Sequence, residues 1–235
     1  MNKPVLGITH HGRAEAGMVA ELLAAEQVYV EIRQPLAGDS LLDPAQYSGA
    51  VIFGGAMSAN DEHLDGIAAE IRWADRAIRA GLPLFGICLG AQMIAKVLGG
   101  EVGPRDDGQW EIGYRTLEPT EAGRQLFSPQ QTFFQWHGEG FTLPQGAERL
   151  AGSALFPQQA FRYGGNVFGT QFHPEVSQPL LHHWQVEFAH DMCHPGGDSI
   201  AQQRRDDALH RVGVESWLMG FLSHFVSLTS ENTGA

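Results

Sequence analysis

Short apolar runs alternate with amphipathic segments over the first hundred residues of the chain. The runs typical of buried strands are Val5–Thr9, Val28–Ile32, Gly49–Gly55 and Leu84–Ile87. Between the last two, residues 64–80 repeat apolar side chains at helical spacing. Short apolar strands that alternate with helices indicate βαβ units. We therefore expect an α/β fold built on a mostly parallel sheet with helices on both faces.

The amphipathic segment at 64–80 has a clear division of residue types. Its apolar positions at helical spacing are Ile67, Ile71, Ala74 and Ile78. The charged residues that lie between them are Glu70, Arg72, Asp75, Arg76 and Arg79. This pattern predicts a helix with one face against the sheet.

The second half of the chain has a different character. From about Gly99 to Phe172, short strand-like segments are separated by Gly and Pro turns. From about Gln178 the chain is typical of helices, with a polar break at 194–198. We expect a single domain over 1–235, with a catalytic core at about 5–176 and a helical tail at about 177–230. The β-rich second half should pack onto the same sheet.

Composition and charge narrow the class of protein. The chain has 235 residues, 43% of them hydrophobic, as in ordinary globular proteins. Its formal net charge of −12 opposes nonspecific association with nucleic acid or an anionic membrane. Two cysteines give no disulfide framework, and the N-terminal residues lack the apolar run of a signal peptide. We expect a cytoplasmic protein with neither a nucleic-acid nor a membrane partner.

The segment "PLFGICLGAQMIA" at 83–95 places Cys88 between a predicted strand and a predicted helix, with Gly86 and Gly90 on either side. A nucleophile on such a tight turn projects above the carboxyl ends of the strands, and its neighbours must be small. The helix N-terminus lowers a thiol pKa and offers N–H groups to an oxyanion. The alternative is a buried structural cysteine. The strand–turn–helix pattern favours the nucleophile.

A thiol nucleophile needs a base, and the segment "GTQFHPE" supplies a candidate. His173 ends an apolar run, and Glu175 follows after a proline that fixes φ. The carboxylate can then hold the imidazole and set its tautomer. In isolation such a segment is more often a simple turn, but with Cys88 the catalytic interpretation is preferred.

Three further features carry weaker signals. Gly54 and Gly55 end a predicted strand and let a backbone N–H point into a site, although a simple turn has the same pattern. His10 and His11 follow the first strand and are expected in a loop near the rim of the site. The five tryptophans form no stripe, and most are expected in the core or an interface.

A row of histidines follows the predicted core. If this segment is helical, one face carries His183, Glu187, His190 and His194. Such side chains can bind a transition metal. A polar stripe facing solvent or an interface is the preferred interpretation, so we predict no metal and no cofactor.

Taken together, these segments resemble the class I (triad) glutamine amidotransferases. "GICLGAQ" is similar to that family's nucleophile elbow, "FGG" to its oxyanion strand and "QFHPE" to its His-x-Glu signature, all in the expected order. "QWHGEGF" at 135–141 resembles a loop that helps hold glutamine in these enzymes. The greatest resemblance is to stand-alone, GMP-synthase-like glutaminase domains. It implies a flavodoxin-like fold with the site at the carboxyl edge of the sheet.

The resemblance also implies roles for particular residues. Cys88 would be the nucleophile, His173 the general base and acid, and Glu175 the residue that orients His173. The residues implied in the oxyanion hole are Gly55 and Leu89, and those implied in substrate binding are Gln92, Gly138 and Glu139. The implied reaction is attack on a γ-carboxamide, a γ-glutamyl thioester, release of ammonia or an amine, and hydrolysis to glutamate.

The family pattern leaves the use of the released nitrogen open. About 60 residues follow Glu175, too few for a typical synthase domain. The chain is therefore expected either to have a separate synthase subunit as partner or to act alone on its small-molecule substrate. Some relatives hydrolyse γ-glutamyl peptides, which is the main alternative. Chaperone- and peptidase-like members of the wider superfamily and a non-catalytic binding module of the same fold are the remaining alternatives.

Overall fold

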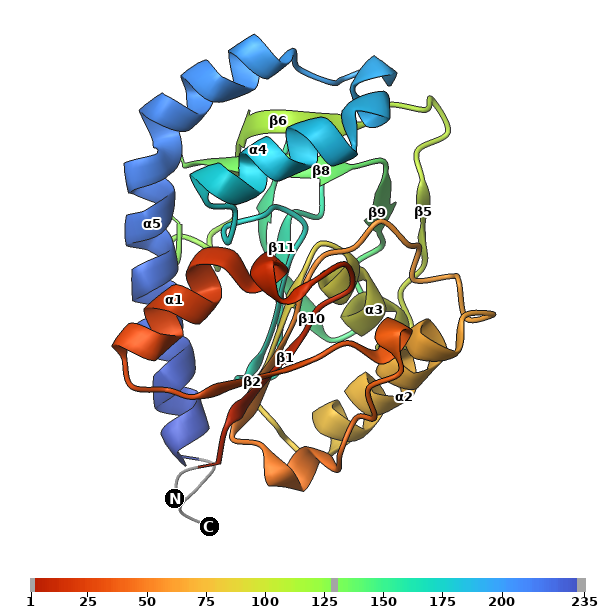
Figure 1. The fold of residues 1–235 in the computed structure, drawn as a ribbon, viewed down its shortest axis with the longest axis vertical. Helices are drawn as coiled ribbons and strands as arrows, with labels where there is room; N and C mark the ends of the chain where they lie inside the picture. Colours follow the sequence, from red (N-terminus) through yellow and green to blue (C-terminus); the bar gives the residue numbers. More distant parts are fainter. Residues whose placement is uncertain (1–2, 128–130, 232–235) are drawn as a thin grey trace.

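A sheet of eight strands runs through the middle of the molecule (Figure 1). The computed structural model describes residues 3–127 and 131–231. The strands of this sheet are β1 (Val5–Ile8), β2 (Val30–Arg33), β3 (Gly49–Ile52), β4 (Leu84–Ile87), β7 (Glu118–Pro119), β10 (Ala147–Gly152), β11 (Ala160–Tyr163) and β12 (Val167–Thr170). Their order is β2-β1-β3-β4-β12-β11-β10-β7. The first five are parallel and the last three antiparallel, so the predicted mostly parallel α/β sheet is confirmed.

Helices cover both faces of the sheet (Figure 1). The α-helices are α1 (Gly17–Ala25), α2 (Asp65–Arg79), α3 (Leu89–Val97), α4 (Gln178–Glu187) and α5 (Ile200–Glu231). The short 3-10 helices are η1 (Arg13–Ala16), η2 (Pro35–Ala37), η3 (Pro44–Gln46) and η4 (Ala189–Cys193). Helices α1 and α5 contact each other on one face, and α2 and α3 contact each other on the other face. No helix among the described residues is long and apolar enough to cross a membrane.

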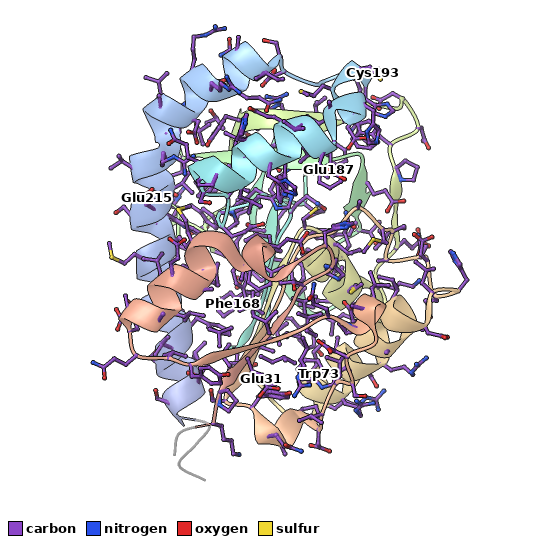
Figure 2. The ribbon with its side chains drawn as sticks, in the orientation of Figure 1. Glu31, Trp73, Phe168, Glu187, Cys193 and Glu215 are labelled. Carbon is purple, nitrogen blue, oxygen red and sulfur yellow. The ribbon has the colours of Figure 1, made fainter. Side chains whose placement is uncertain are left out.

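The central strands are buried on both faces because successive side chains point to opposite layers. On β4, Leu84 belongs to the same hydrophobic cluster as Trp73 of α2, while Phe85 packs with Phe221 of α5, their rings 4.6 Å apart. Figure 2 shows the two layers, with Phe168 on the α5 side and Trp73 on the α2 side. Burial of each such side chain contributes roughly 1.5–3 kcal/mol.

The second half of the chain only partly joins this sheet. Strands β10, β11 and β12 extend it, but two further pairs form separate two-stranded sheets. These pairs are β5 (Val102–Pro104) with β9 (Glu139–Phe141), and β6 (Glu111–Thr116) with β8 (Thr132–His137). These four strands therefore do not join the main sheet through hydrogen bonds. The β6–β8 hairpin instead packs its aromatic side chains against α4.

One charged residue of α2 departs from the amphipathic pattern. Glu70 lies between apolar positions in the sequence, yet its side chain is fully buried. It accepts a hydrogen bond from His10, which follows β1. A buried partner, not the helical period, therefore decides where this carboxylate lies.

The parallel strands bring four loops to one edge of the sheet. Because β1, β3, β4 and β12 run in the same direction, the residues after their carboxyl ends meet there. Helix α3 starts at this edge in close contact with β3. A Cβ atom on Gly90 would lie 2.1 Å from the carbonyl oxygen of Ile52, so only glycine permits this approach.

Replacing Gly90 with alanine should destabilise the protein although alanine is the better helix former. Helix α3 must move away from β3, at an expected cost of about 1–3 kcal/mol. Gly213 of α5 has open space around its Cα, so Gly213→Ala should instead stabilise by up to about 1 kcal/mol. Thermal unfolding followed by circular dichroism compares the two. An equal gain from both substitutions would contradict the tight contact.

Candidate active site

Cys88 lies on the turn between β4 and α3 at the carboxyl edge of the sheet. Its backbone has φ 50° and ψ −107°, in a region that non-glycine residues rarely occupy. Its N–H donates to the carbonyl oxygen of Thr170, with 2.7 Å between N and O. Gly86 allows the turn to close, since a Cβ there would lie 2.6 Å from backbone atoms of α3. The turn presents the thiol to the site while leaving it only 5% exposed.

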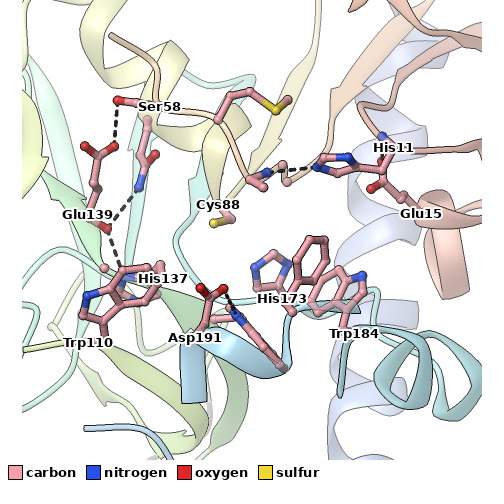
Figure 3. Close-up of a pocket in the computed structure, with 18 of the residues that line it drawn as sticks. His11, Glu15, Ser58, Cys88, Trp110, His137, Glu139, His173, Trp184 and Asp191 are labelled. Carbon is pink, nitrogen blue, oxygen red and sulfur yellow. Dashed lines mark hydrogen bonds between the residues drawn. The ribbon is translucent and has the colours of Figure 1, made fainter. Parts of the chain in front are cut away.

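His173 and Glu175 lie just after β12 and form a buried pair. The His173 Nδ1 and Glu175 Oε1 atoms are 2.7 Å apart, and both side chains are almost fully buried. The Cys88 thiol lies close enough to the His173 imidazole for its charge to raise the pKa of His173 (Figure 3). The backbone of Glu175 is held by the N–H of Met18 on α1, which donates to its carbonyl oxygen. Three segments far apart in the sequence thus place thiol, imidazole and carboxylate in one chain of contacts.

The charge state of His173 depends on these neighbours. Burial alone would lower the pKa of His173, but the charges of Glu175 and Cys88 outweigh it and raise this pKa to about 10. The shift makes the imidazole a strong proton acceptor for the thiol.

The loop after β3 supplies backbone donors beside the thiol. A Cβ on Gly54 would lie 2.7 Å from the His173 ring, so the backbone passes directly over the imidazole. The carbonyl oxygen of Gly54 accepts a hydrogen bond from His10 Nδ1 at 2.7 Å. The N–H of Gly55 has no acceptor among the described residues. Leu89 begins α3, where N–H groups lack partners within the helix.

A set of polar side chains lies on one side of the thiol (Figure 3). The Gln92 amide nitrogen donates to the carbonyl oxygens of the Glu139 backbone and the Gln171 side chain. The Gln171 amide nitrogen is 3.5 Å from the Cys88 sulfur. The Glu139 carboxylate accepts a hydrogen bond from Ser58 at 2.8 Å. This side of the site can therefore hold a small polar group.

The loop at 137–139 is fixed from beneath. His137 Nδ1 donates to the Glu139 carbonyl oxygen at 3.0 Å, and its Nε2 lies 3.3 Å from the Glu111 carboxylate on β6. Gly138 packs so closely on Trp110 that a Cβ would lie 2.2 Å from the indole ring. Both Gly138 and Glu139 line the cavity that contains Cys88.

Aromatic side chains form the other side of the site. Trp184 of α4 contacts the His173 ring edge to face at 4.8 Å. Trp136 lies 6.1 Å from Trp184 and 6.3 Å from Phe188. The indole N–H of Trp136 donates to Asp191 of η4 (Figure 3). All of these residues line a cavity of about 610 Å³ that also contains Cys88.

The structure brings together all the residues implied in the site by sequence: Cys88, His173, Glu175, Gly55, Leu89, Gln92, Gly138 and Glu139. Other contributors were missed. Trp136 and Trp184 belong to a buried hydrophobic cluster, as expected for most tryptophans, and together with Trp110 they also line the cavity. His10 and His11 lie in the loop between β1 and η1, as predicted; His11 lines the cavity, whereas His10 is buried and paired with Glu70. Its signal was the pair of histidines directly after β1.

The predicted histidine face does not exist as one helical stripe. Helix α4 ends at Glu187, and His190 lies in η4 and His194 beyond it. His194 stacks on Trp110, with ring centroids 4.2 Å apart. Within residues 3–127 and 131–231, no group of three or more His, Cys, Asp or Glu side chains is placed to hold a metal ion.

Comparison with known proteins fits this geometry. The family model described as glutamine amidotransferase class-I matches residues 15–185. The chain belongs to the class-I glutamine amidotransferase family. The match includes the Cys88 turn, the loop at 137–139 and the His173–Glu175 pair, and the resemblance seen in the sequence is confirmed.

Individual relatives of this amidotransferase differ in length. A GMP synthase (glutamine-hydrolyzing) of Lacticaseibacillus rhamnosus is 32% identical over 201 residues, which cover 75% of this chain and 37% of that protein. The chain thus spans little more than a third of that relative. A glutamine amidotransferase structure from Thermotoga maritima is 29% identical with a TM-score of 0.79, covering 100% of both chains. A structure from Methylobacillus flagellatus, 24% identical, has the same fold with a TM-score of 0.90, covering 97% of this chain and 96% of that one.

The raised pKa of His173 makes the stability of this amidotransferase depend on pH. The folded protein keeps a proton that the unfolded chain loses above its ordinary pKa of 6.5. The resulting stabilisation is complete below pH 6.5, declines as pH rises, and is lost above about 10. Glu175→Gln removes the principal raising charge, so the decline in thermal midpoint between pH 7 and 10 should become shallower. Parallel declines in the two proteins would contradict this pairing.

Proposed function

We propose that the protein is a cysteine-dependent amidohydrolase that acts on the γ-carboxamide of glutamine or on a γ-glutamyl amide. The observation that carries the proposal is the single chain of contacts from Cys88 through His173 to Glu175 at the carboxyl edge of the sheet. Family membership supports the same chemistry, since a relative is named as glutamine-hydrolyzing.

In the first step, Cys88 transfers its proton to His173 and its sulfur attacks the γ-carbonyl carbon. The C=O bond opens to a tetrahedral oxyanion. The N–H groups of Gly55 and Leu89 donate hydrogen bonds to this oxygen, at the N-terminus of α3. Loss of one such donor typically costs about 10²–10³ in kcat.

The second step expels the nitrogen. The C–N bond breaks as His173 returns the proton to the leaving amine, which departs as ammonia or a free amine. A γ-glutamyl thioester on Cys88 remains. Water then gives a proton to His173 and attacks the thioester carbon, the C–S bond breaks, glutamate is released, and His173 returns the proton to the Cys88 sulfur. Glu175 holds the imidazole orientation throughout.

We assign the glutamyl head of the substrate to the polar side of the site. Gln92, Gly138 and Glu139 line this region, and Gln92 and Glu139 are already fixed by hydrogen bonds to neighbouring groups. Fixed polar groups orient a ligand without further ordering cost. We assign the glutamyl α-amino group to the region of Gly138 and Glu139.

Two routes for the released nitrogen follow from this site. A stand-alone hydrolase releases it to solvent. A glutaminase subunit passes it to a separate synthase subunit, a possibility supported by the longer GMP synthase relatives that this chain only partly spans. A non-catalytic binding module of the same fold would have no need for the buried Cys88–His173–Glu175 contacts.

Glutamate release from glutamine and γ-glutamyl peptides tests the proposal. Cys88→Ala should lower kcat at least about a thousandfold, because the attacking atom is gone. Glu175→Ala should lower it less, by about 10²-fold, since Glu175 orients and does not attack. The exposed Cys193 serves as the matched control, and Cys193→Ala should leave turnover unchanged. Turnover that survives in Cys88→Ala would refute the mechanism.

A further inference from the structure

The cavity around Cys88 is larger than glutamine requires. Its volume of about 610 Å³ is in the range of about 300–1,000 Å³ typical of sites for drug-sized ligands. Glutamine, with only an NH₂ group on its γ-carbonyl, is much smaller than such ligands. Space therefore remains for a substituent on the leaving nitrogen.

The reaction requires the substituted nitrogen to lie near His173. The leaving nitrogen must approach His173, which gives it a proton, and this proton comes from the ring nitrogen not bonded to Glu175. The His173 ring contacts Trp184 at 4.8 Å. A group attached to the nitrogen thus extends from His173 along the aromatic wall, defined here as Trp136, Trp184 and Phe188.

The wall is apolar, and the charges beside it are negative. Trp136 and Trp184 are each 9% exposed, so their rings are already packed and ordered. The Asp191 carboxylate lies at the edge of the wall, 3.0 Å from the Trp136 indole nitrogen and 3.2 Å from His190. None of the described residues that line the cavity is Lys or Arg. A carboxylate on the leaving group would be repelled by the Asp191 carboxylate and would find no Lys or Arg in the cavity lining to pair with.

We infer that the preferred substrate is a γ-glutamyl amide whose amine carries an aromatic or apolar body and no carboxylate, bound along the aromatic wall. The inference rests on the proposed hydrolysis at Cys88. It adds a chemical class for the leaving group, which distinguishes γ-glutamyl amines from γ-glutamyl peptides.

Two amides with the same aromatic body provide the test. γ-Glutamylphenethylamide and γ-glutamylphenylalanine differ by one carboxylate. The wild-type protein should show a kcat/KM at least about tenfold higher for the phenethylamide than for either γ-glutamylphenylalanine or glutamine. Asp191→Asn should narrow the gap between the two amides, because the repelling charge is gone.

Variants of the wall separate binding from folding. Phe188→Ala should lower kcat/KM for the phenethylamide about tenfold and that for glutamine much less. Val186→Ala, at a solvent-exposed position on α4, is the control and should change neither. Turnover of glutamine without preference for the phenethylamide overturns this inference alone. Absence of any Cys88-dependent turnover overturns the proposed function as well.

His10 lies beneath the loop that follows β3. Its Nδ1 donates to the Gly54 carbonyl oxygen at 2.7 Å, and its Nε2 lies 2.9 Å from the Glu70 carboxylate. Both side chains are fully buried. Burial alone would lower the pKa of His10, but the hydrogen bond and charge of Glu70 raise it. With both ring nitrogens donating, the imidazole links α2 to the Gly54–Gly55 peptide.

The direction of this peptide matters for catalysis. In a trans peptide, the C=O of Gly54 and the N–H of Gly55 point in opposite directions. Holding the Gly54 oxygen on His10 therefore turns the Gly55 N–H away from His10. We propose that His10, held by Glu70, is a positioning residue that keeps the Gly55 N–H aimed at the oxyanion.

Two substitutions at His10 test this role. His10→Leu should lower kcat about 10²–10³-fold with little change in KM, and should weaken binding of the aldehyde analogue of glutamine by the same factor. This analogue adds the Cys88 sulfur and forms the tetrahedral oxygen. His10→Asn places an amide N–H near the position of Nδ1. Its kcat should be at least about tenfold higher than that of His10→Leu.

Controls keep the test independent of folding. His183→Leu, at an exposed position of α4, should change neither kcat nor KM. If His10→Leu does not fold, Glu70→Gln is measured in its place. It should lower kcat and the affinity for the aldehyde while KM stays constant. A change in KM that equals the change in kcat, or aldehyde affinity that stays at the wild-type value, overturns the positioning role.

Discussion

The strained backbone of Cys88 is the constraint on which the site depends. Its φ of 50° costs about 1–3 kcal/mol and persists only because the surroundings hold it. The N–H of Cys88 is bonded to Thr170 on β12, and α3 is pressed onto β3 at Gly90. The sheet thereby fixes both ends of the turn. A thiol on a regular strand or helix would lack this combination of exposure to the cavity and adjacent N–H groups.

Two buried histidine–carboxylate pairs lie on either side of this turn. His173 with Glu175 faces the thiol, and His10 with Glu70 holds the loop at Gly54. Each pair involves substantial desolvation, which is compensated only by close hydrogen bonds. His10 and Glu70 come from segments 60 residues apart, whereas His173 and Glu175 lie two residues apart in one segment that faces Cys88. The two pairs thus fix the His173 imidazole and the Gly54–Gly55 peptide around the sulfur. Loops without such pairs would leave these positions variable.

Much of the fold could be predicted because its pattern is local. Alternating apolar runs and helical spacing identify the parallel strands and α2, and the Cys88 and His173 segments carry distinctive motifs. The pairing of His10 with Glu70 could not be predicted, because a helical period treats Glu70 as a surface residue. Likewise, the aromatic wall combines Trp136 with Phe188, which are brought together only by the packing of α4 on the β6–β8 hairpin.

Selective modification of Cys88 tests whether His173 activates its thiol. A chloroketone analogue of glutamine is incubated with the protein, and the labelled cysteine is located by peptide mass spectrometry. We expect one equivalent on Cys88, none on the more exposed Cys193, and a large loss of labelling rate in His173→Ala. Equal labelling of both cysteines, or a rate on Cys88 that does not depend on His173, would contradict this activation.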